Sequence, residues 1–183
     1  RLTEAVAGID QAGGKVEIRV PVERALTLYL NAQEIVTMMT INDYPEYLAL
    51  GYLLNQHMLL PDDVVTGIDY DEELAVVVVR TKRKTNYEKK LKKKVQTSGC
   101  AQGTVFGDLL NDLHGIQLPP AAAARIRQST LHRMLETMRQ QDSIHRKAGS
   151  VHGCALFRGA EMLMFVEDVG RHNAIDTISG WMA

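Results

Sequence analysis

The sequence predicts a mixed α/β fold, in which strands fill most of the first half and helices alternate with strands in the second. Two patterns carry this prediction. Apolar residues recur at every second position near residue 16, and at every third or fourth position near residue 131. The chain of 183 residues is 45% hydrophobic, which is ample for a buried core and excludes a disordered or fibrous protein.

The first elements are predicted to be strands. Val16, Ile18 and Val20 alternate with charged residues, which is typical of a half-buried strand, and Pro21 ends it. Residues 25–30 and 34–40 then form two strands of a hairpin around the turn at residues 31–33.

A helix and a further strand follow the hairpin. Asn42 or Asp43 is expected to cap a helix over residues 46–54, with Pro45 in its first turn, where no amide donor is needed. Residues 74–79 are β-branched and apolar, which predicts a buried strand.

Residues 82–94 form a basic segment in which eight lysines and arginines are opposed only by Glu88. A block of this kind is either a solvated surface segment or a docking patch for an anionic ligand or an acidic partner. The segment has one aromatic residue, Tyr87, and the whole chain carries a net charge of -1, so we do not expect nucleic-acid binding.

The second half mixes helices with strands. Residues 104–113 show a short helical pattern, and Leu131, Met134, Leu135 and Met138 predict a longer helix whose methionine stripe packs in the core. Residues 151–158 and 161–166 predict two strands that turn at residues 159–160, and Gly170 precedes a helix that begins near residue 171.

The composition also predicts a compartment. No apolar run approaches the roughly 18 residues that span a bilayer, and the first residues lack the pattern of a signal peptide, so we expect no membrane segment. Two cysteines are too few for a disulfide scaffold and favour the reducing cytoplasm. The chain ends inside an apolar pattern at residues 180–183, which suggests a fragment of a longer protein.

Cys100 is the candidate nucleophile. It lies among small residues in Thr97-Ser98-Gly99-Cys100-Ala101-Gln102-Gly103, before an expected helix whose dipole and free amides would stabilise a thiolate. The alternative is a buried, inert cysteine, but a loop flanked by glycines fits that reading poorly.

The sequence Glu167-Asp168-Val169-Gly170-Arg171-His172-Asn173 is the second candidate site, because a strand there ends in carboxylates and a helix then opens with a cation and a histidine. The alternative is a network that caps the helix. His152 and Cys154 alternate along a strand and are most simply a hydrogen-bonded histidine and a small core residue. The metal-binding motifs C-x-x-C and H-E-x-x-H are absent, so no metal site is predicted.

The two candidate sites together resemble the FdhD/NarQ family of formate dehydrogenase accessory sulfurtransferases, on Thr97-Ser98-Gly99-Cys100 and on the block Glu167 to Asn173 followed by Ala174 and Asp176. Residues 21–23, 45–53 and 148–152 add weaker likenesses along most of the chain. The resemblance implies a fold similar to cytidine deaminases. Residues 1–95 would be a β-rich part with one helix and the basic segment, and residues 96–183 a deaminase-like α/β part truncated at its C-terminal end.

The family resemblance also implies an activity. Cys100 would accept persulfide sulfur from a cysteine desulfurase and transfer it to the molybdenum or tungsten bis-guanine-dinucleotide cofactor of formate dehydrogenase. The expected partners are that desulfurase, the catalytic subunit of the dehydrogenase and the cofactor itself, bound as a substrate; a homodimer is also considered. The resemblance suggests that the cofactor is bound by five residues: His152, Asp168, Arg171, His172 and Asn173.

Two departures from the family pattern matter. Many members carry a second cysteine at the position of Gly103, and without it sulfur release needs an external reductant. A cofactor-binding motif near the family's C-terminus has no counterpart in these residues. A cofactor chaperone whose cysteine is dispensable is therefore the alternative to a sulfurtransferase, and a zinc-dependent hydrolase is a third, weaker reading.

Overall fold

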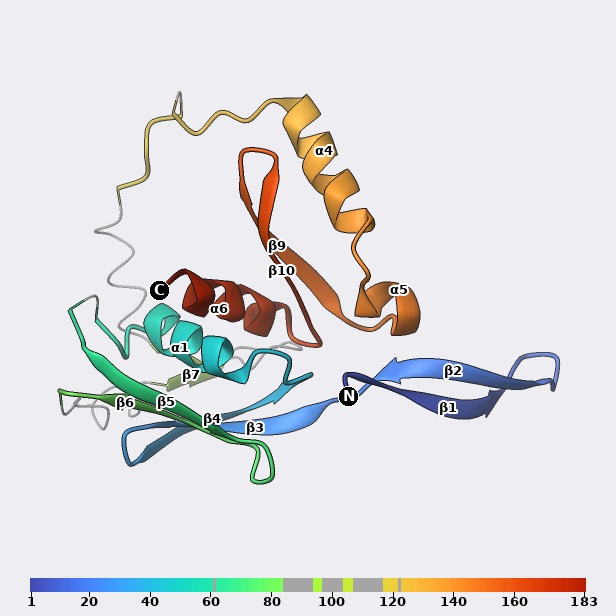
Figure 1. Ribbon diagram of the computed structural model, residues 1–183, viewed down its shortest axis with the longest axis horizontal. Helices are drawn as coiled ribbons and strands as arrows, with labels where there is room; N and C mark the ends of the chain where they lie inside the picture. Colours follow the sequence, from blue (N-terminus) through green and yellow to red (C-terminus); the bar gives the residue numbers. More distant parts are fainter. Residues whose placement is uncertain (61, 84–93, 97–103, 107–116, 122) are drawn as a thin grey trace.

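A four-stranded sheet with a helix on one face forms the centre of the protein, seen here in a computed structural model (Figure 1). The structure describes residues 1–60, 62–83, 94–96, 104–106, 117–121 and 123–183. The sheet has the strand order β4-β3-β6-β5, and its strands are β3 (Arg24–Leu30), β4 (Gln33–Thr40), β5 (Val65–Asp71) and β6 (Val76–Thr81). β3 runs parallel to β6, and the other neighbours are antiparallel.

The core lies between this sheet and helix α1 (Pro45–Asn55). Every second residue of β3 is buried, and Leu26, Leu28 and Leu30 are fully enclosed against Leu48 and Leu53 of α1. Period-2 burial on β3 means that one face of the sheet is apolar and needs a cover, which α1 supplies.

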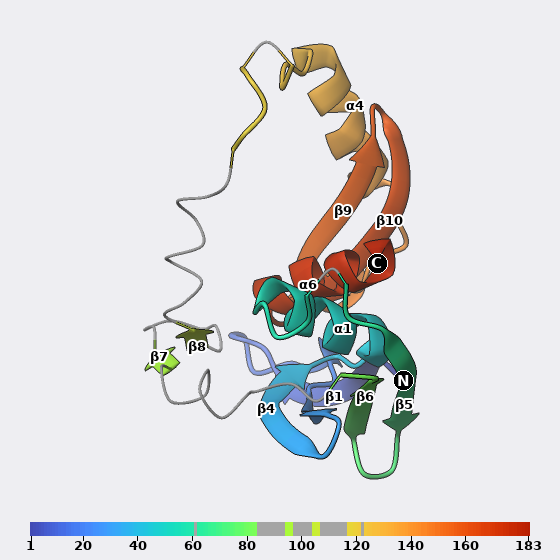
Figure 2. The ribbon, with the colours of Figure 1, turned by 90° about the vertical axis from the view of Figure 1, so that its left-hand side faces the viewer.

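Helix α6 (Arg171–Met182) packs on α1 and joins the C-terminal part of the chain to the central sheet (Figures 1 and 2). Two glycines lie where the helices cross. A β-carbon on Gly51 would stand 1.7 Å from the carbonyl oxygen of Asp176, and one on Gly180 would stand 1.9 Å from that of Tyr47. Only glycine permits this backbone approach, so the crossing depends on both residues.

The remaining elements surround α6. β9 (His152–Arg158) and β10 (Glu161–Asp168) form an antiparallel hairpin on α6, and α4 (Gln128–Arg139) lies beside that hairpin (Figure 2). α5 (Ile144–Ala148) joins α4 to β9. β7 (Lys94–Gln96) and β8 (Thr104–Phe106) pair with each other.

β1 (Thr3–Ile9) and β2 (Lys15–Pro21) form a two-stranded hairpin that projects from the body, with its base against α5 (Figure 1). The strand expected around Val16 and Ile18 is confirmed. The prediction that its apolar face is half-buried is wrong, because 36% of Val16 and 55% of Ile18 is exposed. Alternation predicts a strand from local pattern, whereas burial also needs a partner layer, which this ribbon lacks in the described chain.

The mixed α/β class and most elements are confirmed. The hairpin of residues 25–40, the helix near residue 46, the strands after residue 151 and the helix from Arg171 lie where the pattern placed them. The strand predicted from residue 74 begins at Val76 instead, and Leu74 is exposed.

Two other expectations were wrong. Residues 104–106 form strand β8, so the helix expected from there does not begin at Thr104; residues 107–113 lie outside the described residues. The helix around Met134 is present as α4, yet it buries none of its residues, because one thin hairpin covers only part of its apolar stripe. Among the helices of the described residues, none is long and apolar enough to cross a membrane.

Candidate functional site

Strand β10 supplies two carboxylates to different surroundings at its C-terminal end. Successive side chains of a strand point to opposite faces, so Glu167 and Asp168 diverge. Both are buried, with 6% and 4% of their surface exposed. Glu167 lines a pocket under α4 and α5, whereas Asp168 faces the end of β4.

The pocket beside Glu167 combines an apolar floor with four basic or titratable side chains. Arg139 of α4, His145 and Arg146 of α5 and His152 of β9 line it; we call it the basic pocket. Its apolar lining includes Leu135, Met138, Val151 and Phe165, and its volume is about 560 Å³. This volume lies within the range of pockets that hold small molecules and cofactors. The lining suits a ligand that joins an apolar, planar part to an anionic part.

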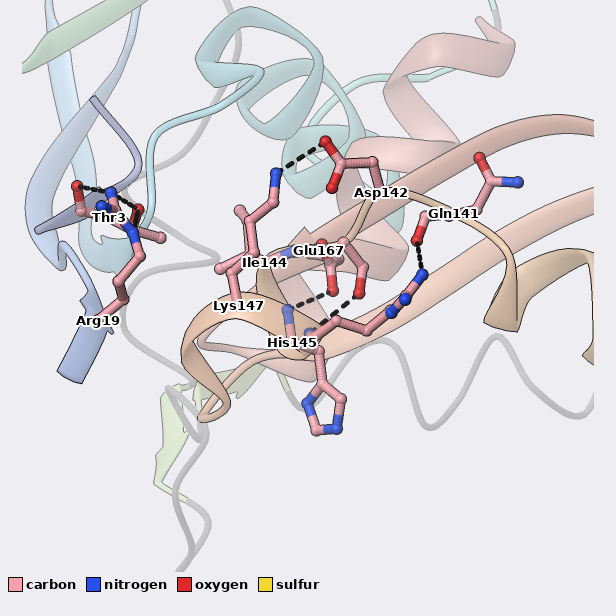
Figure 3. A network of polar contacts seen from close by, with 10 residues as sticks. Thr3, Arg19, Gln141, Asp142, Ile144, His145, Lys147 and Glu167 are labelled. Carbon is pink, nitrogen blue, oxygen red and sulfur yellow. Dashed lines mark hydrogen bonds and ion pairs between the residues drawn. The ribbon is translucent and has the colours of Figure 1, made fainter.

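Three backbone amides at the N-terminus of helix α5 donate to side chains, and Figure 3 shows the two that donate to Glu167. The Glu167 carboxylate accepts from the amides of Ile144 and His145, the latter at 3.0 Å, and Ser143 Oγ accepts from the amide of Arg146 at 3.1 Å. Free helix amides attract anions, but these three are already paired within the protein. Any anion in the basic pocket therefore relies on side chains.

A tight turn returns the chain from α5 to β9. Gly149 and Ser150 have φ values of 66° and 55°, and the Gly149 amide donates to the carbonyl of His145 at 2.9 Å. Left-handed residues in succession reverse the chain within two positions. His152 therefore begins β9 close to the helix that carries His145 and Arg146.

Asp168 is the centre of a buried junction between the two halves of the chain. Its carboxylate accepts hydrogen bonds from Thr40 Oγ1, from the amide of Ile41 at 3.2 Å and from the amide of Gly170 at 2.8 Å. Asn173 Nδ2 donates to the same carboxylate and to the carbonyl of Met39, both at 2.8 Å. A carboxylate with four protein donors stabilises the fold.

Arg171 and His172 lie in the first turn of α6, and both are exposed. Within the described part of the chain, neither lines the basic pocket and Arg171 forms no ion pair. The alternative of a capping network, with Asp168 as the N-cap and Arg171 in a surface ion pair, is wrong for the described residues: Gly170 is the N-cap of α6 and no side chain caps the helix, although Asp168 accepts a hydrogen bond from the Gly170 amide.

The electrostatics differ on the two sides of β10. Burial, followed by the negative charges of Glu167 and Asp168, raises the pKa of Asp43 above its ordinary value. An anion would meet the same repulsion near Asp43 and Asp168, whereas Arg139 and Arg146 attract it on the opposite side. Two arginines therefore make the basic pocket the more favourable of the two sides for an anion, with Glu167 as the carboxylate on its lining.

The structure brings some of the predicted site residues together, since His152 is the partner of Asp168 in the pairing of β9 with β10. Asp168 and Asn173 contact each other, His152 lies in the basic pocket, and Arg171 and His172 stand apart from that pocket. Cys100 and Gly103 lie outside the described residues, as do residues 84–93 of the basic segment. The role of each predicted residue in sulfur transfer or cofactor binding stays a prediction.

Sequence reasoning missed Arg139, His145 and Arg146. For His145 and Arg146 the sequence holds a modest indication of a short helix. Residues 143–149 read Ser-Ile-His-Arg-Lys-Ala-Gly, in which an N-cap residue and a terminal glycine enclose three basic or titratable side chains. Cys154, the other cysteine of the chain, is half-buried, and burial raises the pKa of its thiol. Within the described residues, no three His, Cys, Asp or Glu side chains gather in a way that could hold a metal ion.

Fold and site together define a mixed α+β protein with a basic, partly apolar pocket between a strand hairpin and two helices. The chain belongs to the FdhD/NarQ family, whose model matches residues 21–183.

Named relatives agree with this membership. The chain is 26% identical over 167 residues to "Sulfur carrier protein FdhD" of Listeria monocytogenes serotype 4b (strain F2365), a match that covers 91% of this chain and 64% of the relative. It is 28% identical over 169 residues to the protein of the same name from Bacillus subtilis (strain 168), covering 91% and 63%. The chain thus spans somewhat under two thirds of the length of these relatives.

A crystal structure from Desulfotalea psychrophila, described as a formate dehydrogenase accessory protein, has the same fold. It superposes with a TM-score of 0.66 at 16% sequence identity, covering 98% of this chain and 65% of that one. At this identity the likeness concerns the fold alone.

Proposed function

We propose that this protein is a sulfur carrier for the maturation of formate dehydrogenase. Cys100 takes sulfur from a cysteine desulfurase and passes it to the molybdenum or tungsten bis-guanine-dinucleotide cofactor. Membership of the FdhD/NarQ family is the observation that carries the proposal, and the names of the relatives support it. The cytoplasm, where thiols stay reduced, is the proposed compartment.

Loading is a thiol exchange at sulfur. The Cys100 thiolate attacks the outer sulfur of the desulfurase persulfide, the sulfur–sulfur bond of the desulfurase breaks, and its thiolate leaves. No electrons are gained or lost overall. Release of that sulfur as sulfide consumes two electrons, and because residue 103 is glycine we assign them to an external thiol reductant.

The basic pocket is our proposed place for a guanine-nucleotide half of the cofactor. Arg139 and Arg146 would bind the phosphates, and the apolar lining around Phe165 would cover the planar base. His145 and His152 are further donors on the same lining.

The first experiment tests sulfur loading. The protein is incubated with a cysteine desulfurase and cysteine, and the peptides are then weighed by mass spectrometry without reduction. We expect one added sulfur on the Cys100 peptide and none after Cys100→Ala. Cys154→Ala is the matched control and should load like the wild type. A wild-type protein that gains no sulfur would refute the carrier role.

A cofactor chaperone without sulfur chemistry is the second candidate, and one observation favours it: the arginine, histidine and apolar side chains of the basic pocket suit a nucleotide by themselves. This reading predicts that Cys100→Ala still activates formate dehydrogenase in cells that lack the native protein. Loss of activation with nucleotide binding intact would reject the chaperone in favour of the sulfur carrier.

A further inference from the structure

Glu167 stands out because its buried carboxylate binds a helix that is too short to stand alone. α5 has five residues, and isolated helices of that length are unstable in water. The amides of Ile144 and His145 both donate to Glu167 (Figure 3), and the amide of Arg146 donates to Ser143. The start of α5 is therefore anchored to β10 by one side chain.

The surroundings of Glu167 direct both of its carboxylate oxygens to α5. Gly153 lies directly opposite on β9, and a β-carbon there would stand 3.3 Å from the Phe165 ring and 4.0 Å from Glu167 Cγ. The glycine thus makes room for the Phe165 ring, while Glu167 Cγ lies at an ordinary contact distance. Each carboxylate oxygen accepts an amide of α5, so the negative charge is directed into the helix terminus, where the dipole stabilises it.

The other contacts of α5 are weaker. Lys147 and Asp142 form an ion pair at 2.7 Å, but 48% and 84% of these side chains is exposed, so the pair adds little. Arg146 reaches the carbonyl of Gln141 only at 3.4 Å. The base of β2 packs on α5 from another side. Glu167 is thus the one buried charged group of the described chain that binds the α5 backbone.

We infer that Glu167 is a positioning residue of the basic pocket: it fixes α5 so that His145 and Arg146 lie on the pocket lining beside Arg139. This inference rests on the proposed function, because it concerns how the pocket holds the cofactor's nucleotide. Glu167 acts through α5 and need not touch the ligand.

Glu167→Gln provides the test, with GDP as the probe because it reproduces the guanosine and paired phosphates of the cofactor. Glutamine has the same shape but one acceptor oxygen, so its NH₂ group faces an amide that it cannot bind. We expect GDP affinity to fall about tenfold or more, and the amides of Ile144 and His145 to exchange hydrogen faster, while those of α1 do not change.

Asp142→Asn is the matched control, since it removes a neighbouring exposed carboxylate that makes no contact with the α5 amides. It should leave GDP affinity and amide exchange near the wild-type values. If Glu167→Gln also speeds exchange in α1, Ser143→Ala is used in its place, because that variant removes the third capping bond of α5, from the amide of Arg146 to Ser143, and leaves Glu167 intact. GDP affinity and amide exchange in α5 are then measured in the same way.

The outcomes separate the two proposals. Faster exchange in α5 with unchanged GDP affinity would overturn the positioning role and leave the pocket assignment standing. A wild-type protein that binds no GDP would overturn the pocket assignment together with the positioning role, while sulfur loading of Cys100 would still test the carrier role by itself.

Discussion

Arg146 shows how a single cation in the basic pocket can be assigned a role. It lies on the described lining with Arg139, and its guanidinium has only one long contact, to the carbonyl of Gln141 at 3.4 Å. The planar guanidinium therefore has N–H donors available for a phosphate. Hydrogen bonds to charged groups are among the stronger ones in proteins.

Replacing Arg146 with alanine should weaken GDP binding about tenfold to a hundredfold, because charge-assisted hydrogen bonds to phosphate are lost. Equilibrium dialysis at low and at high salt measures the effect, and the difference from wild type should shrink as salt screens the attraction. Arg158→Ala is the control, since this exposed arginine ends β9 and does not line the pocket. Equal losses in both variants would indicate a general charge effect.

Asp176 is the buried titratable group at the crossing of α1 and α6. Burial raises the pKa of its carboxyl from 3.8 to about 6, against the opposing effects of the Asn55 hydrogen bond at 2.6 Å and the charge of His172. Its charge also contributes, after burial, to the pKa of about 12 of Tyr52. Because the folded protein holds this proton more tightly than the unfolded chain, stability falls as pH rises from about 4 to about 6 and is then level.

Asp176→Asn should remove that dependence. At pH 7 the variant should unfold at a higher urea concentration than the wild type, because its free energy of unfolding is larger by up to about 3 kcal/mol. This difference should vanish below pH 4. Urea titrations at several pH values measure it. Asp142→Asn changes an exposed carboxylate and should leave the pH profile unchanged; a profile for Asp176→Asn parallel to the wild type would contradict the assignment.

At the scale of elements, the local sequence pattern predicted the helices and strands in which the apolar repeat continues over many residues and in which glycine or proline marks the ends. β9, β10 and α6 are examples, because alternation, Gly159 and Gly170 fix them within a few residues. α5 could not be found in this way. It has five residues, and two of its capping bonds come from Glu167, more than twenty positions further along the chain.

In the candidate site too, the contacts between residues near in sequence could be predicted, and the contacts between distant elements could not. The sequence pattern singled out Asp168 and Asn173, which the structure joins, because they lie within one turn of chain. It did not predict that Thr40 and Met39 complete their network, or that Arg139 and Arg146 share a pocket with His152. Those contacts depend on how distant elements pack, which residue spacing does not encode. The prediction that Asn42 or Asp43 caps α1 was also wrong, because Tyr44 occupies the N-cap position and no side chain caps the helix.

The crossing of α1 and α6 offers a test at this scale. Gly51→Ala places a methyl group 1.7 Å from the Asp176 carbonyl oxygen and 2.6 Å from the Gly180 amide, so the helices must separate. We expect a loss of about 3 kcal/mol or more despite the better helix propensity of alanine. Thermal denaturation measures it. In the control Gly67→Ala, the added carbon meets Arg80 and Asp69 at 3.7 and 3.9 Å, and its effect should be small.

At the scale of the whole molecule, several contacts connect residues 1–95 with residues 96–183, and β2 packing on α5 is one of them. α6 packs on α1, and Asp168 of β10 binds Thr40 and Ile41 at the end of β4. Asp168 and Thr40 are buried in these contacts, whereas interfaces between independent domains resemble transient protein–protein interfaces. The division stays a prediction, and the contacts favour one cooperative unit.

Asp168→Ala tests that cooperativity. The change leaves the Thr40 hydroxyl, the Ile41 amide and the Asn173 side chain without their buried acceptor, and each unpaired group costs about 1–3 kcal/mol. Urea unfolding is followed by the fluorescence of Trp181, the single tryptophan, on α6, and by circular dichroism, to which the strands of the central sheet contribute. We expect both probes to report one transition that moves to lower urea together. A Trp181 transition that shifts alone, with the rest of the signal unmoved, would show that residues 96–183 unfold independently of the central sheet.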